Sequence, residues 1–512
     1  MNVIVVLLAG ILIIVFVKYY LVNKQRNRPK RLSKSHLPPQ LKTVWDIPGP
    51  RILPFLGTKW IFSIYYKINK LHEAYADLNK KYGDIVLEVA PAGIPIVHLF
   101  GKDDIEKVLK YPSKYPFRPP TEIIAIYRKS RPDRYASIGI VNEQGEKWHH
   151  LRSNLTPHMT SPKVLQQFLP ALNLIFNDFI DLLKQKRDPQ TNIVENFQDI
   201  TNLLGLEATC ALMLGRRMGF LSTDGSQPEN IKLLAGAVKQ LFISQRDSYY
   251  GFGLWKYLPT KTYRDFTASE EIIYNVVSDI IDNTASDDDA SCDDDLKCVF
   301  LEILKNDQLD IREKKSAIID FIAAGIETLA NTLIFNLHYI IKDPFCLSRI
   351  REEFQNSSEL IYQDDLSKAT YTKACIQEVY RLQPTAFCLA RLLEEETTLS
   401  DYNLKAGTIV ICHSMLACRK EENFKDAKKF KPERWIQNNN LHVNTESGSG
   451  IVIPFGSGKR TCPGKRFVNL ELILLVAKLC KTFDITFMNE MEIDCEFLLV
   501  AKPPVNLILK DI

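Results

Sequence analysis

Apolar residues recur every three to four positions over most of the chain, which is the period of an amphipathic α-helix. This pattern predicts helices within four stretches, at residues 67–83, 165–185, 311–344 and 464–483. Two short segments, 85–90 and 94–100, are apolar and alternating and predict strands of a small sheet. Strand–helix alternation with a period of about 30 residues does not occur. We therefore expect a mainly α-helical protein with a small β-sheet region, of the α+β class.

The longest predicted helix, 311–344, is apolar nearly all round through its middle, which indicates burial on every side. About 32 residues at 1.5 Å each would extend roughly 48 Å and cross a whole domain. Gly325 and Glu327 lie at its centre, where glycine costs about 1 kcal/mol relative to alanine and a buried carboxyl needs partners. We interpret the pair as a sign that the helix passes close to another group. A kinked core helix with a satisfied glutamate is the alternative.

The N-terminal segment, residues 1–22, is almost free of charge and long enough to span a thin bilayer as a helix of about 20 residues. A basic linker and a proline-rich hinge follow at 23–57, and we expect the main domain to occupy 58–512. Because positive charges cross membranes poorly, the domain should stay on the non-translocated side. An uncleaved membrane anchor is expected, with a cleaved signal peptide or a mitochondrial presequence as alternatives.

Composition narrows the chemistry. The net charge of +4 is too small to indicate nucleic-acid binding. The 11 cysteines are scattered, and without a zinc-like Cys-x-x-Cys pair they read as reduced thiols. The acidic run at 286–297 predicts a solvated loop rather than a metal site, because no turn-making glycine accompanies it.

One cysteine stands apart, in the sequence FGSGKRTCPGKRF at 455–467. Pro463 is favoured at the first position of a helix, so Cys462 should lie at or just before a helix N-terminus, where a thiolate is favoured. Arg460 offers a fixed charge for a carboxylate. Such a thiolate could be a haem ligand, a reactive nucleophile or a structural cysteine. No histidine lies nearby to act as the base that a nucleophile needs.

These residues resemble a known family. The stretch Phe455–Gly464 is similar to the haem-binding signature of the cytochrome P450 monooxygenases. Ala324–Thr328 resembles the oxygen-activating motif of their central helix, and Glu378–Arg381 resembles their Glu-x-x-Arg motif. Segment 430–435 is similar to the one that completes an ion network with it, and Trp148–Arg152 to a haem contact. The resemblance implies that fold, with a long central helix over the haem.

The resemblance also implies roles for individual residues. The cofactor would be haem b, with Cys462 as the thiolate ligand of its iron, and dioxygen would be the co-substrate. Further haem contacts are expected at Trp148, Arg152, Arg391, Phe455, Gly458, Arg460 and Gly464. The catalytic pair would be Glu327 and Thr328.

Two further sets of residues follow from the resemblance. A structural ion network is expected between Glu378, Arg381 and Arg434. Candidate contacts to an apolar substrate are Phe321, Ala324, Thr385, Phe387, Phe497 and Leu498. Gly325 is expected to leave room for dioxygen beside the central helix.

The implied reaction inserts one atom of dioxygen into a C–H bond. Segments 114–152 and 385–396 are most similar to steroid-hormone hydroxylases of the mitochondrial branch in insects. The alternatives are another steroid hydroxylase, a monooxygenase of broad xenobiotic range, and a haem-thiolate gas sensor. Gln377 stands where that branch often has a basic residue.

An electron-donor protein is needed, because the chain shows no flavin or nucleotide motif. The donor would be a ferredoxin fed by an NADPH reductase in the mitochondrion. It would be an NADPH–cytochrome reductase if the anchor holds the protein in the endoplasmic reticulum membrane. Lys373, Lys465 and Arg466 are candidates to dock an acidic donor.

Overall fold

The computed structural model describes residues 42–54, 56–160, 162–223, 229–251, 253–286, 303, 305–437, 440–441 and 449–512. The predicted anchor, most of the basic linker and the acidic run after Ser286 lie outside these ranges.

Helices account for most of the described chain. They are α2 (Trp60–Ile64), α3 (Leu71–Tyr82), α4 (Lys102–Leu109), α5 (Glu122–Ser130), α6 (Gly145–Thr160), α7 (Pro162–Lys186), α8 (Phe197–Leu214), α9 (Glu229–Tyr250), α10 (Lys261–Ser286), α12 (Ile311–Ile341), α13 (Pro344–Glu353), α14 (Gln363–Lys368), α15 (Thr370–Leu382), α16 (Ser414–Cys418) and α17 (Lys465–Thr482).

The strands are short. They are β1 (Lys42–Thr43), β2 (Ile85–Ala90), β3 (Ile94–Leu99), β4 (Ile193–Val194), β5 (Leu389–Leu392), β6 (Thr397–Leu399), β7 (Tyr402–Leu404), β8 (Ile409–Cys412), β9 (Ile436–Gln437), β10 (Asn440–Leu441), β11 (Phe483–Phe487), β12 (Ile493–Glu496), β13 (Leu498–Ala501) and β14 (Leu507–Asp511). The predicted α+β class is therefore confirmed.

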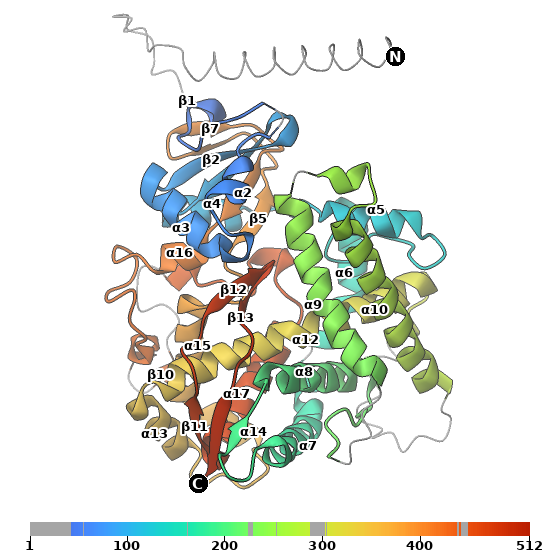
Figure 1. Ribbon diagram of the computed structural model, residues 1–512, viewed down its shortest axis with the longest axis vertical. Helices are drawn as coiled ribbons and strands as arrows, with labels where there is room; N and C mark the ends of the chain where they lie inside the picture. The colour runs from blue at the N-terminus through green and yellow to red at the C-terminus, as the bar shows by residue number, and fades with distance from the viewer. Residues whose placement is uncertain are drawn as a thin grey trace, which may run out of the picture.

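The largest sheet has the order β2-β3-β8-β5 and lies with α2, α3 and α4 at the upper end of Figure 1. β2 and β3 form the predicted antiparallel pair, with Ile85 opposite Leu99. β3 then pairs in parallel with β8, and β5 closes the sheet in the antiparallel sense. Most residues of β2, β3 and β8 are buried, and most of their apolar side chains join one cluster, with Glu88 and His98 buried beside them.

The long helix α12 crosses the middle of the molecule (Figure 1), as its apolar pattern predicts. It begins at an Asp310 cap, whose side chain accepts from the Arg312 amide at 2.8 Å. By length and hydropathy α12 could cross a membrane, yet 67% of its apolar window is buried inside the protein. We therefore treat it as a core helix.

Gly325 serves a different purpose from the one expected. A Cβ at residue 325 would lie 2.1 Å from the Thr209 hydroxyl oxygen on α8, and one at Gly205 would lie 2.7 Å from the Ile326 carbonyl oxygen. The two glycines let α8 and α12 pack in close contact. The expectation that Gly325 leaves room for dioxygen is therefore wrong, because α8 fills that side of the helix.

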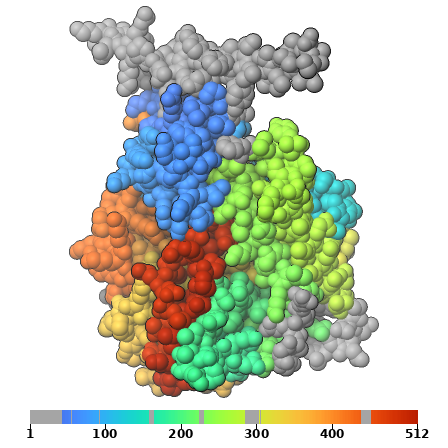
Figure 2. Space-filling view, in the orientation of Figure 1, coloured from blue at the N-terminus to red at the C-terminus, as the bar shows by residue number. Residues whose placement is uncertain are grey.

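The C-terminal hairpin β12–β13 lies at the surface between the N-terminal region and α8 (Figure 2). The backbone amide of Leu499 donates to the Thr385 carbonyl at 2.8 Å. Asn331 joins the hairpin to α12, because its side-chain oxygen accepts from the Ala501 amide at 3.0 Å. These bonds fix the hairpin against the middle of the central helix.

Candidate functional site

The cysteine loop, Phe455–Gly464, is held by its own backbone. The Cys462 amide donates to the Phe455 carbonyl at 2.8 Å. Gly456 and Gly458 have φ of +80° and +67°, values that glycine adopts without steric cost. Among the nine cysteines of the described residues, only Cys462 is exposed. The loop therefore presents one accessible thiol.

The helix after the loop begins later than predicted. α17 starts at Lys465 with Gly464 as its cap, so Cys462 lies three residues before the helix and not at its first turn. The backbone amides of Gly464 and Lys465 still point at the sulfur. The local reason is the turn that Pro463 and Gly464 make before helical geometry is reached.

Burial among protein atoms raises the pKa of the Cys462 thiol, although the sulfur is accessible. The two amides of Gly464 and Lys465 and the positive charge of Arg152 lower this pKa, with the smaller effect. These amides and the charge of Arg152 are the features of the loop that favour the expected thiolate. A nucleophilic cysteine needs a lowered pKa, whereas a metal ion deprotonates a coordinating thiol itself. The site favours a metal ligand over a nucleophile.

Three predicted arginines reach the loop from different elements. Arg152, on α6, donates from Nη2 to the carbonyl of residue 461 at 2.6 Å. Arg391, on β5, reaches the carbonyl of residue 457 at 3.4 Å. Arg460 ends the short helix η7 (Gly458–Arg460), and its guanidinium carbon lies 4.0 Å from the centre of the Trp148 ring. Trp148 is buried beneath it.

A fourth arginine, Arg118, completes the group. Burial and repulsion from Arg118, Arg391 and Arg152 lower the pKa of Arg460 to about 9, so it remains charged at neutral pH. Among the residues that the structure describes, none of these four arginines forms an ion pair with a carboxylate. A cofactor with two carboxylates beside the thiol would neutralise them. The donor set therefore fits haem.

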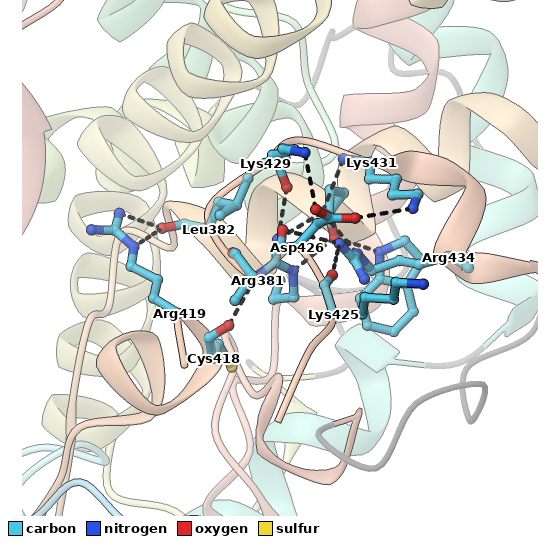
Figure 3. Close-up of polar contacts among 12 residues, drawn as sticks. Arg381, Leu382, Cys418, Arg419, Lys425, Asp426, Lys429, Lys431 and Arg434 are labelled. Atoms are coloured by element: carbon cyan, nitrogen blue, oxygen red, sulfur yellow. Dashed lines mark hydrogen bonds and ion pairs between the residues drawn. The ribbon is translucent and has the colours of Figure 1, made fainter. Parts of the chain in front are cut away.

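A second arginine cluster lies in the region shown in Figure 3. Glu378 and Arg381, on α15, are fully buried, and Arg381 donates to the two Glu378 oxygens at 2.9 and 2.7 Å. Arg434, on η5 (Pro432–Trp435), donates to the same carboxylate at 3.0 Å, and the Trp435 indole does so at 2.9 Å. The structure thus brings together the three residues of the predicted network.

Backbone carbonyls satisfy the rest of Arg381. They belong to Cys418, Ala427 and Lys429, at 2.8, 2.6 and 3.1 Å. Figure 3 shows the Cys418 carbonyl, at the end of α16, and the Lys429 carbonyl, on the following loop, next to the Arg381 guanidinium. The cluster therefore fixes the loop between α16 and η5 to α15, and defines geometry more surely than it adds net stability.

The middle of α12 carries the predicted catalytic pair. Ala324 is exposed although Ile322, Ala323 and Ile326 are buried, so this turn presents an accessible face. The Thr328 hydroxyl lies on the same face and donates to the Ala324 carbonyl at 2.6 Å.

Glu327 is 5% exposed, and burial raises the pKa of its carboxyl to about 8. The charge of Glu496 adds to this rise, and that of Lys239 opposes it. Glu327 therefore holds its proton at neutral pH.

The substrate-contact candidates divide into two groups. Phe321 is half-buried on α12, next to the exposed turn. Phe497 and Leu498 form the half-buried tip of the β12–β13 hairpin, which Thr385 joins through its carbonyl. Phe387 differs, because its ring is 4% exposed and packs near His413 in the core. The structure does not bring Phe387 to an accessible face.

Comparison with known families decides the classification. Residues 47–510 match the family model described as Cytochrome P450. This chain belongs to the cytochrome P450 family. As a cytochrome P450 it carries haem bound through a cysteine thiolate and uses dioxygen.

Several curated cytochrome P450 proteins are similar over most of their length. "Ecdysone 20-monooxygenase" of Drosophila melanogaster is 62% identical over 480 residues, which cover 91% of this chain and 89% of the relative. "Cytochrome P450 302a1, mitochondrial" of the same organism is 27% identical over 89% of this chain and 93% of its own. "1,25-dihydroxyvitamin D(3) 24-hydroxylase, mitochondrial" of Rattus norvegicus is 26% identical over 91% and 88%.

Sequence reasoning missed Arg118 in this cytochrome P450. It lies in the loop before α5, where a single arginine gives no periodic signal. The nearby prolines and the absence of an acidic residue from Lys114 to Pro120 were the available sign. An arginine in a stiff loop without a local acid has to find its counter-charge elsewhere.

Proposed function

We propose that this cytochrome P450 hydroxylates ecdysone to 20-hydroxyecdysone, which activates an ecdysteroid hormone. The observation that carries the proposal is the 62% identity to the Drosophila ecdysone 20-monooxygenase over 91% of the chain. The accessible apolar turn at Ala324 and the half-buried Phe497 and Leu498 support a largely apolar substrate such as a steroid.

The assignment of the haem contacts follows from the chemistry of the loop. Cys462 is the thiolate ligand, because it is the accessible thiol and lies against two backbone amides and Arg152. Arg118, Arg152, Arg391 and Arg460 bind the two haem carboxylates, since no carboxylate among the described residues pairs with them. When bound, haem supplies the activation of dioxygen, using two electrons and two protons, and one oxygen atom leaves as water.

Glu327 and Thr328 supply the protons. The Glu327 carboxyl, buried next to the accessible turn of α12, is protonated at neutral pH and is the proton donor. Because the Thr328 hydroxyl donates its own hydrogen to the Ala324 carbonyl, its oxygen is oriented to accept a hydrogen bond. The pair therefore orients an incoming donor and delivers a proton beside it.

The electron donor is an acidic protein, and we favour a ferredoxin in the mitochondrion. The two relatives at 26–27% identity named above are both described as mitochondrial. Lys465 and Arg466 are exposed at the start of α17, immediately after the cysteine loop, and offer positive charge to such a donor. Imaging of the full-length protein fused to a fluorescent tag tests this, and residence in the endoplasmic reticulum would contradict it.

The decisive experiment is product analysis. The purified holoenzyme is supplied with radiolabelled ecdysone, ferredoxin, ferredoxin reductase and NADPH, and the products are separated against authentic 20-hydroxyecdysone. We expect one product that depends on NADPH and on the donor, and none with T328V. Hydroxylation at another carbon would contradict the assignment to position 20. A holoenzyme that converts several unrelated xenobiotics but not ecdysone would contradict the steroid substrate.

A further inference from the structure

The segment that carries α5 is attached to the cysteine loop at both of its ends. Before α5, the carbonyl of Pro116 accepts from Arg460 Nε at 2.9 Å. After α5, the Gln144 side-chain oxygen accepts from Arg460 Nη2 and from the Arg118 amide, both at 3.0 Å. Any movement of α5 is therefore transmitted to the groups that we assign to haem binding.

α5 also carries a buried arginine, Arg128, whose side chain contacts two other helices. Its Nη1 and Nη2 donate to the two Asp320 oxygens on α12, at 2.9 and 2.5 Å. Glu270, on α10, lies 3.7 Å from Nη2. Figure 1 shows α5 at the same side of the molecule as α9 and α10. One guanidinium thus joins three helices that are distant in sequence.

The loop between α5 and α6 closes over this contact. A Cβ at Gly139 would lie 2.2 Å from Arg128 Nη1 and 2.7 Å from Asp320 Oδ2. The Tyr135 ring lies 4.8 Å from the Arg128 guanidinium carbon, and its hydroxyl donates to Glu270 at 3.2 Å. The pair is therefore sealed from solvent by residues of its own segment.

The charges of the cluster balance if only one carboxyl is ionised. Burial raises the pKa of Glu270, and the charge of Asp320 adds to that rise against the opposing effect of Arg128. Arg128 forms its close ion pair with Asp320, and Glu270 accepts from the Tyr135 hydroxyl at 3.2 Å. A buried charge pair with two parallel hydrogen bonds is geometrically specific.

Asp320 links this pair to the accessible turn of α12. It directly precedes Phe321 and lies four residues before Ala324, which is about one helical turn. The ion pair between Arg128 and Asp320 therefore fixes the position of α5 relative to the accessible turn at Ala324.

We propose that Arg128 is a positioning residue, which holds α5 against α12 and α10 through Asp320 and Glu270 and thereby sets the affinity for the steroid substrate. The use of a steroid as the ligand rests on the proposed function. The clamp formed by Arg128, Asp320 and Glu270 does not, because it is defined by contacts within the chain.

The test uses the holoenzyme and the variants D320N and R128K. Each keeps a polar side chain but loses the bidentate charge pair. We expect the Kd for ecdysone, measured from the shift of the ferric Soret band, to rise about tenfold, as for loss of one charge-assisted hydrogen bond. The rate at saturating ecdysone should change less than about twofold, because bound substrate reacts as before. Amide deuterium exchange in α5 should become faster, and exchange in α15 should not.

A third variant and a matched control accompany them. E270Q loses only the longer contact of 3.7 Å to Arg128 and should raise the Kd less than D320N does. K129M removes an exposed charge from the same helix and should have no effect. A wild-type Kd in D320N and R128K would overturn the proposal. Loss of the carbon-monoxide spectrum in both variants would also overturn it, because it would indicate a role in folding rather than in substrate affinity.

Failure of the proposed function would be separately visible. If wild-type holoenzyme shows no Soret shift with ecdysone, the steroid assignment fails. Deuterium exchange without substrate then still tests the clamp: faster exchange in α5 of D320N supports it, and unchanged exchange refutes it.

Discussion

Two arginine clusters in this molecule differ in how their positive charge is balanced. Around Glu378, the guanidinium of Arg381 is matched by a carboxylate and three carbonyls, and Arg434 shares that carboxylate. Around the cysteine loop, Arg118 and Arg460 lie among other arginines and form no ion pair with a carboxylate of the described residues. The first group carries its counter-charge in the chain, and we propose that the second receives it from haem.

The contrast shows how to separate scaffold from binding site. Arg381, Arg434 and Arg391 are buried and the other arginines of the loop are half-buried, and both groups consist of the residue best suited to bind carboxylates in a planar geometry. The two groups differ in whether a carboxylate of the chain pairs with the arginines. In the second group, burial first and repulsion from the other arginines second lower the pKa of Arg460 to about 9, so an anionic cofactor would stabilise its charged form.

The largest expected effect comes from breaking the complete group. E378Q leaves Arg381 and Arg434 buried without their counter-charge, and we expect the free energy of unfolding to fall by about 3–5 kcal/mol. Denaturant unfolding followed by tryptophan fluorescence measures it. The control E422Q removes an exposed carboxylate 3.6 Å from Lys420 and should cost about 0–1 kcal/mol. Equal effects for the two variants would show that the Glu378 network is not a special part of the scaffold.

Removing one arginine from the group around the cysteine loop should not lower the free energy of unfolding. R118Q removes one repelling cation, so the haem-free protein should be at least as stable as the wild type. Haem should dissociate about tenfold faster, because one charge-assisted contact to a carboxylate is lost. Transfer of haem to apomyoglobin measures the rate.

The matched control for R118Q is K147M, which removes an exposed cation from α6. It should change neither haem dissociation nor stability. A less stable haem-free R118Q protein with unchanged haem dissociation would assign Arg118 to the scaffold and remove the distinction between the two groups.

The smallest expected effect concerns the pKa of Glu327, which burial raises so that the carboxyl stays protonated. The negative charge of Glu496 raises the pKa of Glu327 and the positive charge of Lys239 lowers it. E496Q should therefore lower this pKa and K239M should raise it, each by about half a unit to one unit. Infrared difference titration measures it, with the carboxylic-acid band assigned by its loss in E327Q. Shifts of the same sign in both variants would contradict the account.

The same group makes stability depend on pH. Because the pKa of Glu327 is raised in the folded protein from 4.5 to about 8, the unfolded chain loses this proton first. The free energy of unfolding from this group therefore falls as pH rises through that interval, and is lowest above it. E327Q should remove this part of the slope, whereas E490Q, at an 87% exposed side chain, should not.

Periodicity predicted the elements that pack evenly. The strands predicted at 85–90 and 94–100 are observed at 85–90 and 94–99, and the central helix is observed where its apolar pattern predicted it. The start of α17 was predicted one residue early, at 464, because Gly464 is the cap of the helix and not its first residue. The role of Gly325 was wrong, because the helix that approaches it is 116 positions earlier at Thr209.

The site was predictable only where its residues form local motifs. Glu378 and Arg381 lie on one helical face, so their spacing of three residues predicts their interaction from the sequence. Arg128 and Asp320 are 192 residues apart and neither belongs to a motif, so only the folded chain shows that they meet. Arg118 is recognised by its repulsion of Arg460, and only the folded chain shows that these arginines lie close together.

The central claim is that the Cys462 sulfur is the ligand of the haem iron. The most direct measurement is the absorption spectrum of the reduced, carbon-monoxide-treated holoenzyme of wild type, C462S and C388S. Cys388 is the half-buried cysteine of the described residues. The account predicts the red-shifted band that names the family in wild type and C388S, and its loss in C462S. A spectrum typical of histidine-ligated haem in the wild type, unchanged in C462S, would contradict it.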